Sequence, residues 1–152
     1  MSVTIIKDTI FNSNEDYIAH QCNCVSITSK GLAMLIFEKY PFANTYINRK
    51  GIPSVLGSID AWKTNSNQPG IINMYSQYYP GKSQFDNDSK EIRLLSFQKC
   101  LNYIKEIPYI KSIAFPYNIA CGLAGGNWED YLSLIIQFAQ ENNINVTIYK
   151  NI

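Results

Sequence analysis

Apolar residues in this chain follow two different spacings. Short segments rich in β-branched and aromatic residues, bounded by polar turns, are typical of strands. Elsewhere apolar residues recur every three or four positions, as Leu32, Leu35, Ile36 and Tyr40 do, which is typical of helices. We expect strands over residues 3–6, 17–22, 58–62, 70–77, 112–116 and 146–149, and helices over residues 31–40, 89–107 and 128–142. This alternation predicts an α/β protein with a mixed sheet that helices cover on both faces.

The length and composition indicate a single packed domain over residues 1–152. Of the 152 residues, 46% are hydrophobic and 16% are charged, a balance that disfavours a disordered chain. The 13 lysines and arginines nearly match the 12 acidic residues, and Arg49 and Arg93 are the only arginines. Because broad nucleic-acid binding needs a strong basic excess, we expect no general nucleic-acid partner.

The first residues and the cysteines favour an intracellular protein that is not secreted. MSVTIIKD shows no basic segment followed by an apolar one, so Cys22, Cys24, Cys100 and Cys121 are expected to be reduced. Cys22 and Cys24 have the wrong spacing for a common zinc site, and we expect neither a metal nor a cofactor. The apolar stretches are shorter than the roughly 20 residues of a membrane helix. We therefore expect no membrane partner. The sequence leaves the oligomeric state open, with a monomer favoured.

Two joints between a predicted strand and a predicted helix are candidates for an anion site. Residues 20–33 run from a strand end through a polar loop to a helix start, and residues 115–128 open into a glycine-rich loop. Such joints expose backbone N–H groups, and glycines allow close approach of a ligand. The two loops could hold a diphosphate between them. His20, the only histidine, lies in an apolar strand and fits either a buried structural imidazole or a catalytic one.

Three segments carry a resemblance to a known family: IIKDTIF, IAHQCNCVSITSKGLAMLIFEKYP and IACGLAGGNW. In order and spacing they resemble the opening strand, first ligand loop and phosphate loop of macro domains. The first loop resembles the branch with the yeast-type ADP-ribose 1″-phosphate phosphatase, and the phosphate loop is also similar to that of terminal ADP-ribose glycohydrolases. The resemblance covers nearly the whole chain and implies a three-layer α/β/α macro domain with a mixed central sheet.

The resemblance also implies roles for individual residues. Asp8 would accept a hydrogen bond from adenine, His20 would stand in the place of the proposed catalytic histidine, and Asn23 beside it would face the distal ribose. The backbone N–H groups of residues 122–126 would face the diphosphate. The remaining ligand contacts expected from the two loops are Gln21, Cys22, Lys30, Gly31, Leu32, Ala33, Asn118, Ile119, Cys121, Gly122, Leu123, Ala124, Gly125, Gly126 and Asn127.

The leading function implied by the resemblance is conversion of ADP-ribose 1″-phosphate to ADP-ribose and phosphate, without a metal. A binding module for ADP-ribose, free or attached to a macromolecule, is favoured by residues 28–30 standing where glycines are common. A glycohydrolase that removes ADP-ribose from macromolecules is the third reading. For that reading Ala124 replaces the expected aspartate, residues 73–77 offer no lysine, and Asp86, Asp88 and Glu129 are distant candidates for the acid.

Overall fold

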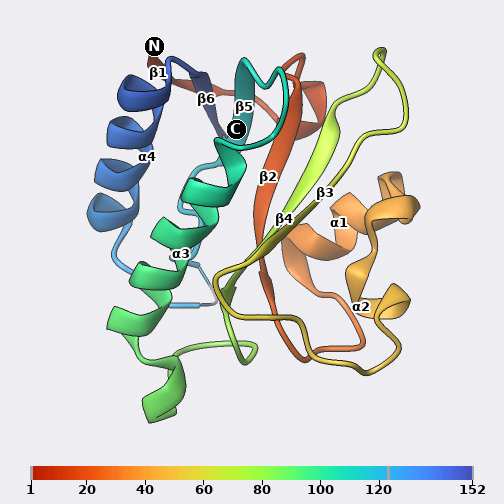
Figure 1. Ribbon diagram of the computed structural model, residues 1–152, viewed down its shortest axis with the longest axis vertical. Coiled ribbons are helices and arrows are strands. Elements are labelled where there is room, and N and C mark those ends of the chain that lie inside the picture. Colours follow the sequence, from red (N-terminus) through yellow and green to blue (C-terminus); the bar gives the residue numbers. More distant parts are fainter. Residues whose placement is uncertain (1, 123, 152) are drawn as a thin grey trace.

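The computed structural model, which describes residues 2–122 and 124–151, is built on a six-stranded sheet with the order β1-β6-β5-β2-β4-β3. Adjacent strands are parallel except for β3, which runs antiparallel to β4 at the edge. The sheet is therefore mixed, as predicted (Figure 1). The strands are β1 (Val3–Lys7), β2 (Tyr17–Asn23), β3 (Ile59–Trp62), β4 (Gly70–Gln77), β5 (Ser112–Pro116) and β6 (Asn145–Lys150).

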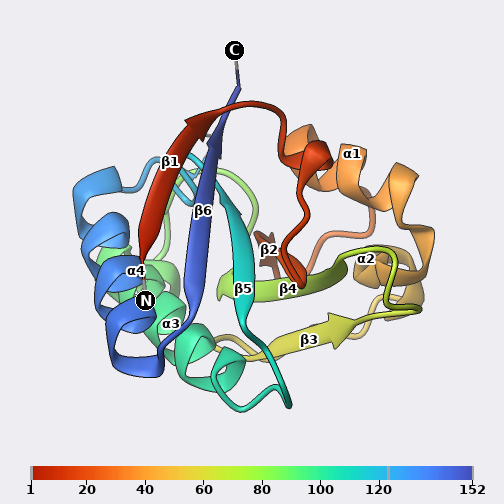
Figure 2. The same cartoon turned by 90° about the horizontal axis from the view of Figure 1, so that it is seen from above.

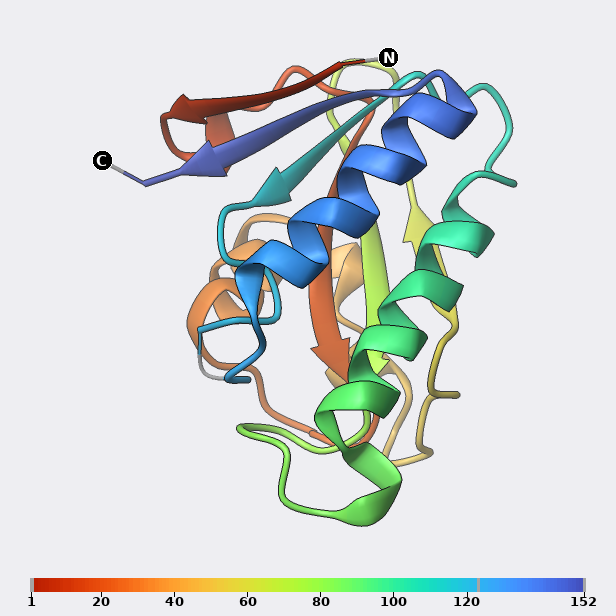
Figure 3. The ribbon, with the colours of Figure 1, turned by 90° about the vertical axis from the view of Figure 1, so that its left-hand side faces the viewer.

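Helices cover both faces of the sheet. α3 (Lys90–Ile104) and α4 (Trp128–Asn142) lie side by side on one face, and α1 (Gly31–Lys39) and α2 (Thr45–Asn48) lie on the other (Figures 2 and 3). This arrangement confirms the three-layer α/β/α fold. Among the described residues, no helix is long and apolar enough to cross a membrane.

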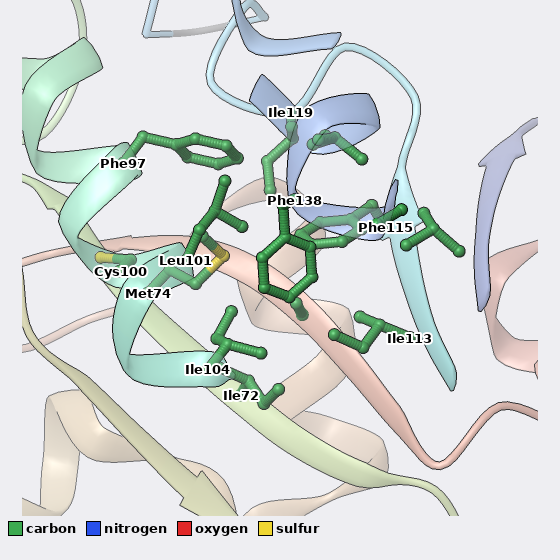
Figure 4. Close-up of a cluster of buried hydrophobic side chains, with 14 of the residues drawn as sticks. Ile72, Met74, Phe97, Cys100, Leu101, Ile104, Ile113, Phe115, Ile119 and Phe138 are labelled. Carbon is green, nitrogen blue, oxygen red and sulfur yellow. The ribbon is translucent and has the colours of Figure 1, made fainter. Parts of the chain in front are cut away.

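The hydrophobic core has one part on each face of the sheet. Figure 4 shows the larger part, where Phe97 and Ile104 of α3 point toward Met74 of β4 and Phe115 of β5. All four side chains are fully buried. The uninterrupted burial of β4 follows from helices packing on both faces of a central strand.

Helix boundaries differ modestly from those predicted by periodicity. The helix predicted over residues 89–107 begins at Lys90, because the Ser89 hydroxyl caps Ile92 N at 3.1 Å. It ends at Ile104, and residues 105–107 continue as a turn. The helix predicted over residues 31–40 ends one residue early, before Pro41, as expected of the position that precedes a proline.

The topology opens a space between β2 and β5. The two strands pair only through Tyr17 and Ile18 of β2 with Ile113 and Ala114 of β5. Beyond this point β2 continues beside β4 alone, up to Asn23. The chain leaves β2 toward α1 on one face and leaves β5 toward α4 on the other, so the carboxyl ends of these neighbouring strands form a topological switch point.

Candidate functional site

A cavity of about 880 Å³ lies at this switch point, between the loop from β2 to α1 and the loop from β5 to α4. Cavities of this size are typical of small-molecule binding sites. Both predicted strand-to-helix joints contribute to its wall. The predicted site residues that line it are His20, Gln21, Asn23, Lys30, Gly31, Leu32, Ala33, Asn118, Ile119, Gly122 and Ala124.

Several other predicted site residues do not line the cavity, and the predicted contact Leu123 lies outside the described residues. Asp8 has its carboxylate next to its own turn, where Oδ1 accepts from Thr9 N at 2.7 Å and from Asn12 Nδ2 at 2.9 Å. The residues absent from the lining are Asp8, Cys22, Cys121, Gly125, Gly126 and Asn127.

The glycine-rich loop uses several of its own N–H groups. Gly125 N donates to Gly122 O at 3.2 Å, and Gly126 N donates to Ala120 O at 2.9 Å. Two of the N–H groups predicted to face a diphosphate are thus already bonded within the loop, and their role toward a ligand stays a prediction. A Cβ on Gly126 would lie 2.6 Å from Ala120 O, so this glycine serves the packing of the loop.

The start of the same loop has an unusual backbone. Asn118 and Ala120 take positive φ angles of 62° and 67°, a region that residues with a Cβ rarely occupy. Such conformations concentrate at ligand-binding and active sites, where the surrounding structure holds them. Both residues line the cavity.

His20 is deeply buried at the cavity floor, with a side chain that is 2% exposed. Its ring packs edge-on against Phe37, with centroids 5.4 Å apart, and its Nε2 lies 2.6 Å from Asn73 Oδ1. Burial lowers the pKa of His20 to about 4, although the hydrogen bond to Asn73 opposes this effect. The imidazole is therefore neutral at neutral pH.

Asn73 determines which nitrogen of His20 carries the proton. Its Nδ2 donates to Ala43 O at 2.9 Å and to Asp60 Oδ1 at 2.7 Å. Its Oδ1 therefore faces His20 and accepts from Nε2–H. In the neutral ring, Nδ1 then keeps its lone pair.

Asn23 shapes the first loop with its side chain. Its Oδ1 accepts from Val25 N at 3.0 Å and from Ser26 N at 2.8 Å, while its backbone N donates to the Tyr46 hydroxyl at 2.9 Å. No described residue offers its Nδ2 an acceptor. Asn23 thus fixes the turn and leaves one amide donor at the cavity.

A chain of amides crosses from β2 to β4 beside the cavity. Ser76 Oγ donates to Gln21 Oε1 at 2.6 Å, Gln21 Nε2 donates to Gln77 Oε1, and Gln77 Nε2 donates to Tyr79 O at 2.8 Å. Each amide is oriented by its neighbour, so Gln21 and Gln77 present fixed polar edges at the cavity.

The electrostatics of the lining are simple. Among the described lining residues, Lys30 carries the one cationic side chain, and there is no carboxylate. Lys30 directly precedes Gly31, the first residue of α1, whose N-terminus carries the positive end of the helix dipole. Across residues 2–122 and 124–151, no group of three or more His, Cys, Asp or Glu side chains could hold a metal ion. The cavity is thus suited to an anion.

Sequence reasoning missed part of the lining. Thr28 and Tyr117 lie within the predicted joints, residues 20–33 and 115–128, and could have been included. Tyr46 and Gln77 reach the cavity from other elements, and no local sequence pattern indicates them. The lining residues absent from the prediction are Ser26, Thr28, Tyr46, Gln77, Pro80, Gly81, Pro116, Tyr117 and Ala120.

Solved structures resemble this protein over nearly its full length. The macrodomain of Mycobacterium tuberculosis DarG is 19% identical, with a TM-score of 0.73 and 97% of both chains covered. The macrodomain of Thermus aquaticus DarG is 17% identical, with a TM-score of 0.74 and 97% of both chains covered. The chain has the macrodomain fold.

Another macrodomain structure shows the same fold at greater distance. A mutant of the Oceanobacillus iheyensis macrodomain, solved with ADPR, is 17% identical, with a TM-score of 0.67, and the match covers 97% of this chain and 83% of that one. No protein-family model matches the sequence, and the curated proteins give no match. The similar solved structures show the macrodomain fold. Membership in the yeast-type branch remains a prediction.

Proposed function

We propose that this protein binds ADP-ribose, with or without a further phosphate, in the cavity between the two loops. The observation that carries the proposal is the charge of the lining, where Lys30 precedes a nine-residue helix and no described carboxylate is present. A diphosphate is favoured by a helix N-terminus and an ammonium, and would be repelled by carboxylates. The Oceanobacillus iheyensis macrodomain, which shares the fold, was solved with ADPR.

Calorimetric titration with ADP-ribose tests the proposal. We expect Lys30→Gln to weaken binding by about three- to tenfold, because a charge-assisted contact to phosphate is lost. Lys105→Gln removes the same charge from an exposed position that does not line the cavity, and should bind like the wild type. Absence of binding at millimolar ligand, or equal losses in the two variants, would refute the proposal.

Hydrolysis of ADP-ribose 1″-phosphate to ADP-ribose and phosphate is the second candidate function. The lone pair on His20 Nδ1 favours it, because an unprotonated ring nitrogen can accept a proton from attacking water. The burial of the ring and its pKa of about 4 make it a weak base. Binding therefore stands ahead of hydrolysis.

The phosphatase function is tested by measuring phosphate and ADP-ribose release separately. If His20 accepts the proton, His20→Gln should lower phosphate release by about 100-fold and leave ADP-ribose affinity unchanged. Ile18→Val, a change in a buried side chain of the same strand that makes no hydrogen bond to His20, controls for repacking. If the wild type binds ADP-ribose but releases no phosphate, hydrolysis is excluded and binding remains.

The glycohydrolase reading has little support in the described lining. Asp86, Asp88 and Glu129 are absent from it, and the Asp88 carboxylate is bonded to Arg93 at 2.6 Å. ADP-ribose attached to a macromolecule therefore enters the proposal as a ligand. Competition between free ADP-ribose and an ADP-ribosylated protein would measure this directly.

A further inference from the structure

Both arginines of the chain contact loops that line the cavity. Neither Arg49 nor Arg93 is among the described residues that line it. Each instead directs its guanidinium at backbone carbonyl oxygens of loops that do. A guanidinium carries five N–H donors in a rigid plane, so one side chain can hold several carbonyls in a fixed arrangement.

Arg49 holds the loop between β2 and α1. Its Nη1 donates to Asn23 O at 3.0 Å and to Ser54 Oγ at 2.8 Å, and its Nη2 donates to Ser26 O at 2.7 Å. The guanidinium lies over the Tyr46 ring, 4.8 Å from the centroid. Residues 23–26, with Ser54, form what we call the Arg49 wall.

Arg93 holds a second segment of the cavity wall. Its Nη1 donates to Gly81 O at 2.7 Å and to Ala124 O at 3.3 Å, and its Nη2 donates to Tyr79 O at 3.1 Å and to Asp88 Oδ2 at 2.6 Å. It thus joins the loop after β4 to the glycine-rich loop after β5. Residues 79–81, with Ala124, form the Arg93 wall.

Holding these oxygens has a consequence for an anionic ligand. A carbonyl oxygen is the negative end of its peptide dipole, so one turned into the cavity would repel a diphosphate. In a trans peptide unit the C=O and the following N–H point in opposite directions. The bond from Arg49 to Ser26 O therefore turns the N–H of Ile27 away from the guanidinium, and the bond from Arg93 to Gly81 O does the same for Lys82.

We propose that Arg49 and Arg93 are positioning residues, which hold the two walls in the form that receives the ligand without contacting it. This inference rests on the proposed binding of ADP-ribose. Removing either arginine frees a wall to take other conformations, and binding must then order that wall again. A purely structural role instead predicts lower global stability with unchanged affinity of the folded protein.

Arg49→Lys and Arg93→Lys are the variants that test the proposal. Lysine keeps the positive charge, but a single ammonium cannot bridge the carbonyls that the guanidinium fork spans. Each variant serves as the control for the other wall. Amide hydrogen exchange is measured on the ligand-free protein, global stability by denaturant unfolding, and ADP-ribose affinity by calorimetry.

We expect faster exchange confined to the wall whose arginine is changed, and about tenfold weaker ADP-ribose binding in each variant. Unchanged exchange at Val25 and Ser26 in Arg49→Lys, or at Tyr79 in Arg93→Lys, would overturn the inference that each arginine holds its wall. Faster exchange with unchanged affinity would overturn the positioning role.

Failure of the proposed function gives a different pattern, since a wild type that does not bind ADP-ribose leaves the exchange measurement intact. Should Arg93→Lys not fold, Arg49→Lys still decides the proposal, because Arg49 is only half buried and has no acidic partner among the described residues.

Discussion

The two walls of the cavity are held by the same chemical group in different electrostatic settings. Arg93 is 3% exposed and is paired with Asp88, which is fully buried. Arg49 is half buried, lies on an aromatic ring, and has no carboxylate partner among the described residues. The charge of the Arg93 wall is therefore compensated by a carboxylate inside the protein, whereas the charge of the Arg49 wall is not.

The two walls should therefore differ in how much stability is lost when a charged group is removed. A buried ion pair contributes little net stability when complete, but either partner left alone is a buried, uncompensated charge. Asp88 also accepts from Tyr78 N at 2.8 Å and from Tyr79 N at 3.0 Å. Loss of the carboxylate would therefore disturb the backbone of the Arg93 wall as well as its charge.

The largest effect should come from breaking the compensated wall. Arg93→Met leaves the Asp88 carboxylate buried without its ion-pair partner, and we expect a loss of about 3–5 kcal/mol in the free energy of unfolding. Arg49→Met, on the half-buried wall, should cost about 1–2 kcal/mol through lost hydrogen bonds. Denaturant unfolding measures both.

A double variant sharpens this result. Adding Asp88→Leu to Arg93→Met removes the uncompensated carboxylate and should recover part of the loss, with Tyr78 N and Tyr79 N still unpaired. Equal losses in Arg93→Met and Arg49→Met would contradict the contrast between the walls.

Lowering the pH should cause a somewhat smaller loss of stability, which arises from His20 in the cavity lining. Its pKa falls from the ordinary 6.5 to about 4 on folding, so the unfolded chain binds more protons between these values. The corresponding stability is present above pH 6.5 and is lost as the pH falls toward 4, by about 3 kcal/mol in total. Unfolding measured at pH 7, 5.5 and 4 checks this.

The control separates His20 from the Arg93 wall. His20→Gln should flatten the profile between pH 6.5 and 4. The pKa of Asp88 lies below its ordinary 3.8, because its hydrogen bonds with Arg93, Tyr78 and Tyr79 outweigh burial. Its contribution is therefore lost only as the pH falls further, and Asp88→Asn should remove that lower step. A profile that His20→Gln leaves unchanged would contradict the low pKa of the imidazole.

The sequence predicted the elements and the general place of the cavity. Apolar spacing is a local property, and the carboxyl ends of parallel strands meet at one edge of a sheet. Asn23 and residues 30–33 therefore fell at the cavity with Asn118 and Ile119, as expected from two joints at the same edge.

The features that the sequence did not predict have two causes. Some depend on hydrogen-bond partners far away in the sequence, and one depends on a neighbouring backbone group that competes with a ligand. Arg93 reaches Ala124, 31 residues further along, and Arg49 reaches back 26 residues to Asn23. No local pattern encodes such pairs. For Asp8 local competition applies, since its Oδ1 accepts from the neighbouring Thr9 N and the residue is absent from the lining. Resemblance to a family indicates which residue stands at a position and does not reveal where its atoms are engaged.

The short pairing of β2 with β5 also bears on how the molecule folds. Asp16 N, just before β2, bonds Ser112 Oγ at the start of β5 across a separation of 96 residues. Closing so long a loop is slow and costs chain entropy. Because the cavity is lined by residues that follow both strands, it cannot form in a partly folded chain that lacks this pairing. A ligand that recognises the cavity can select only the completed fold, and by mass action it will shift the folding equilibrium toward that state.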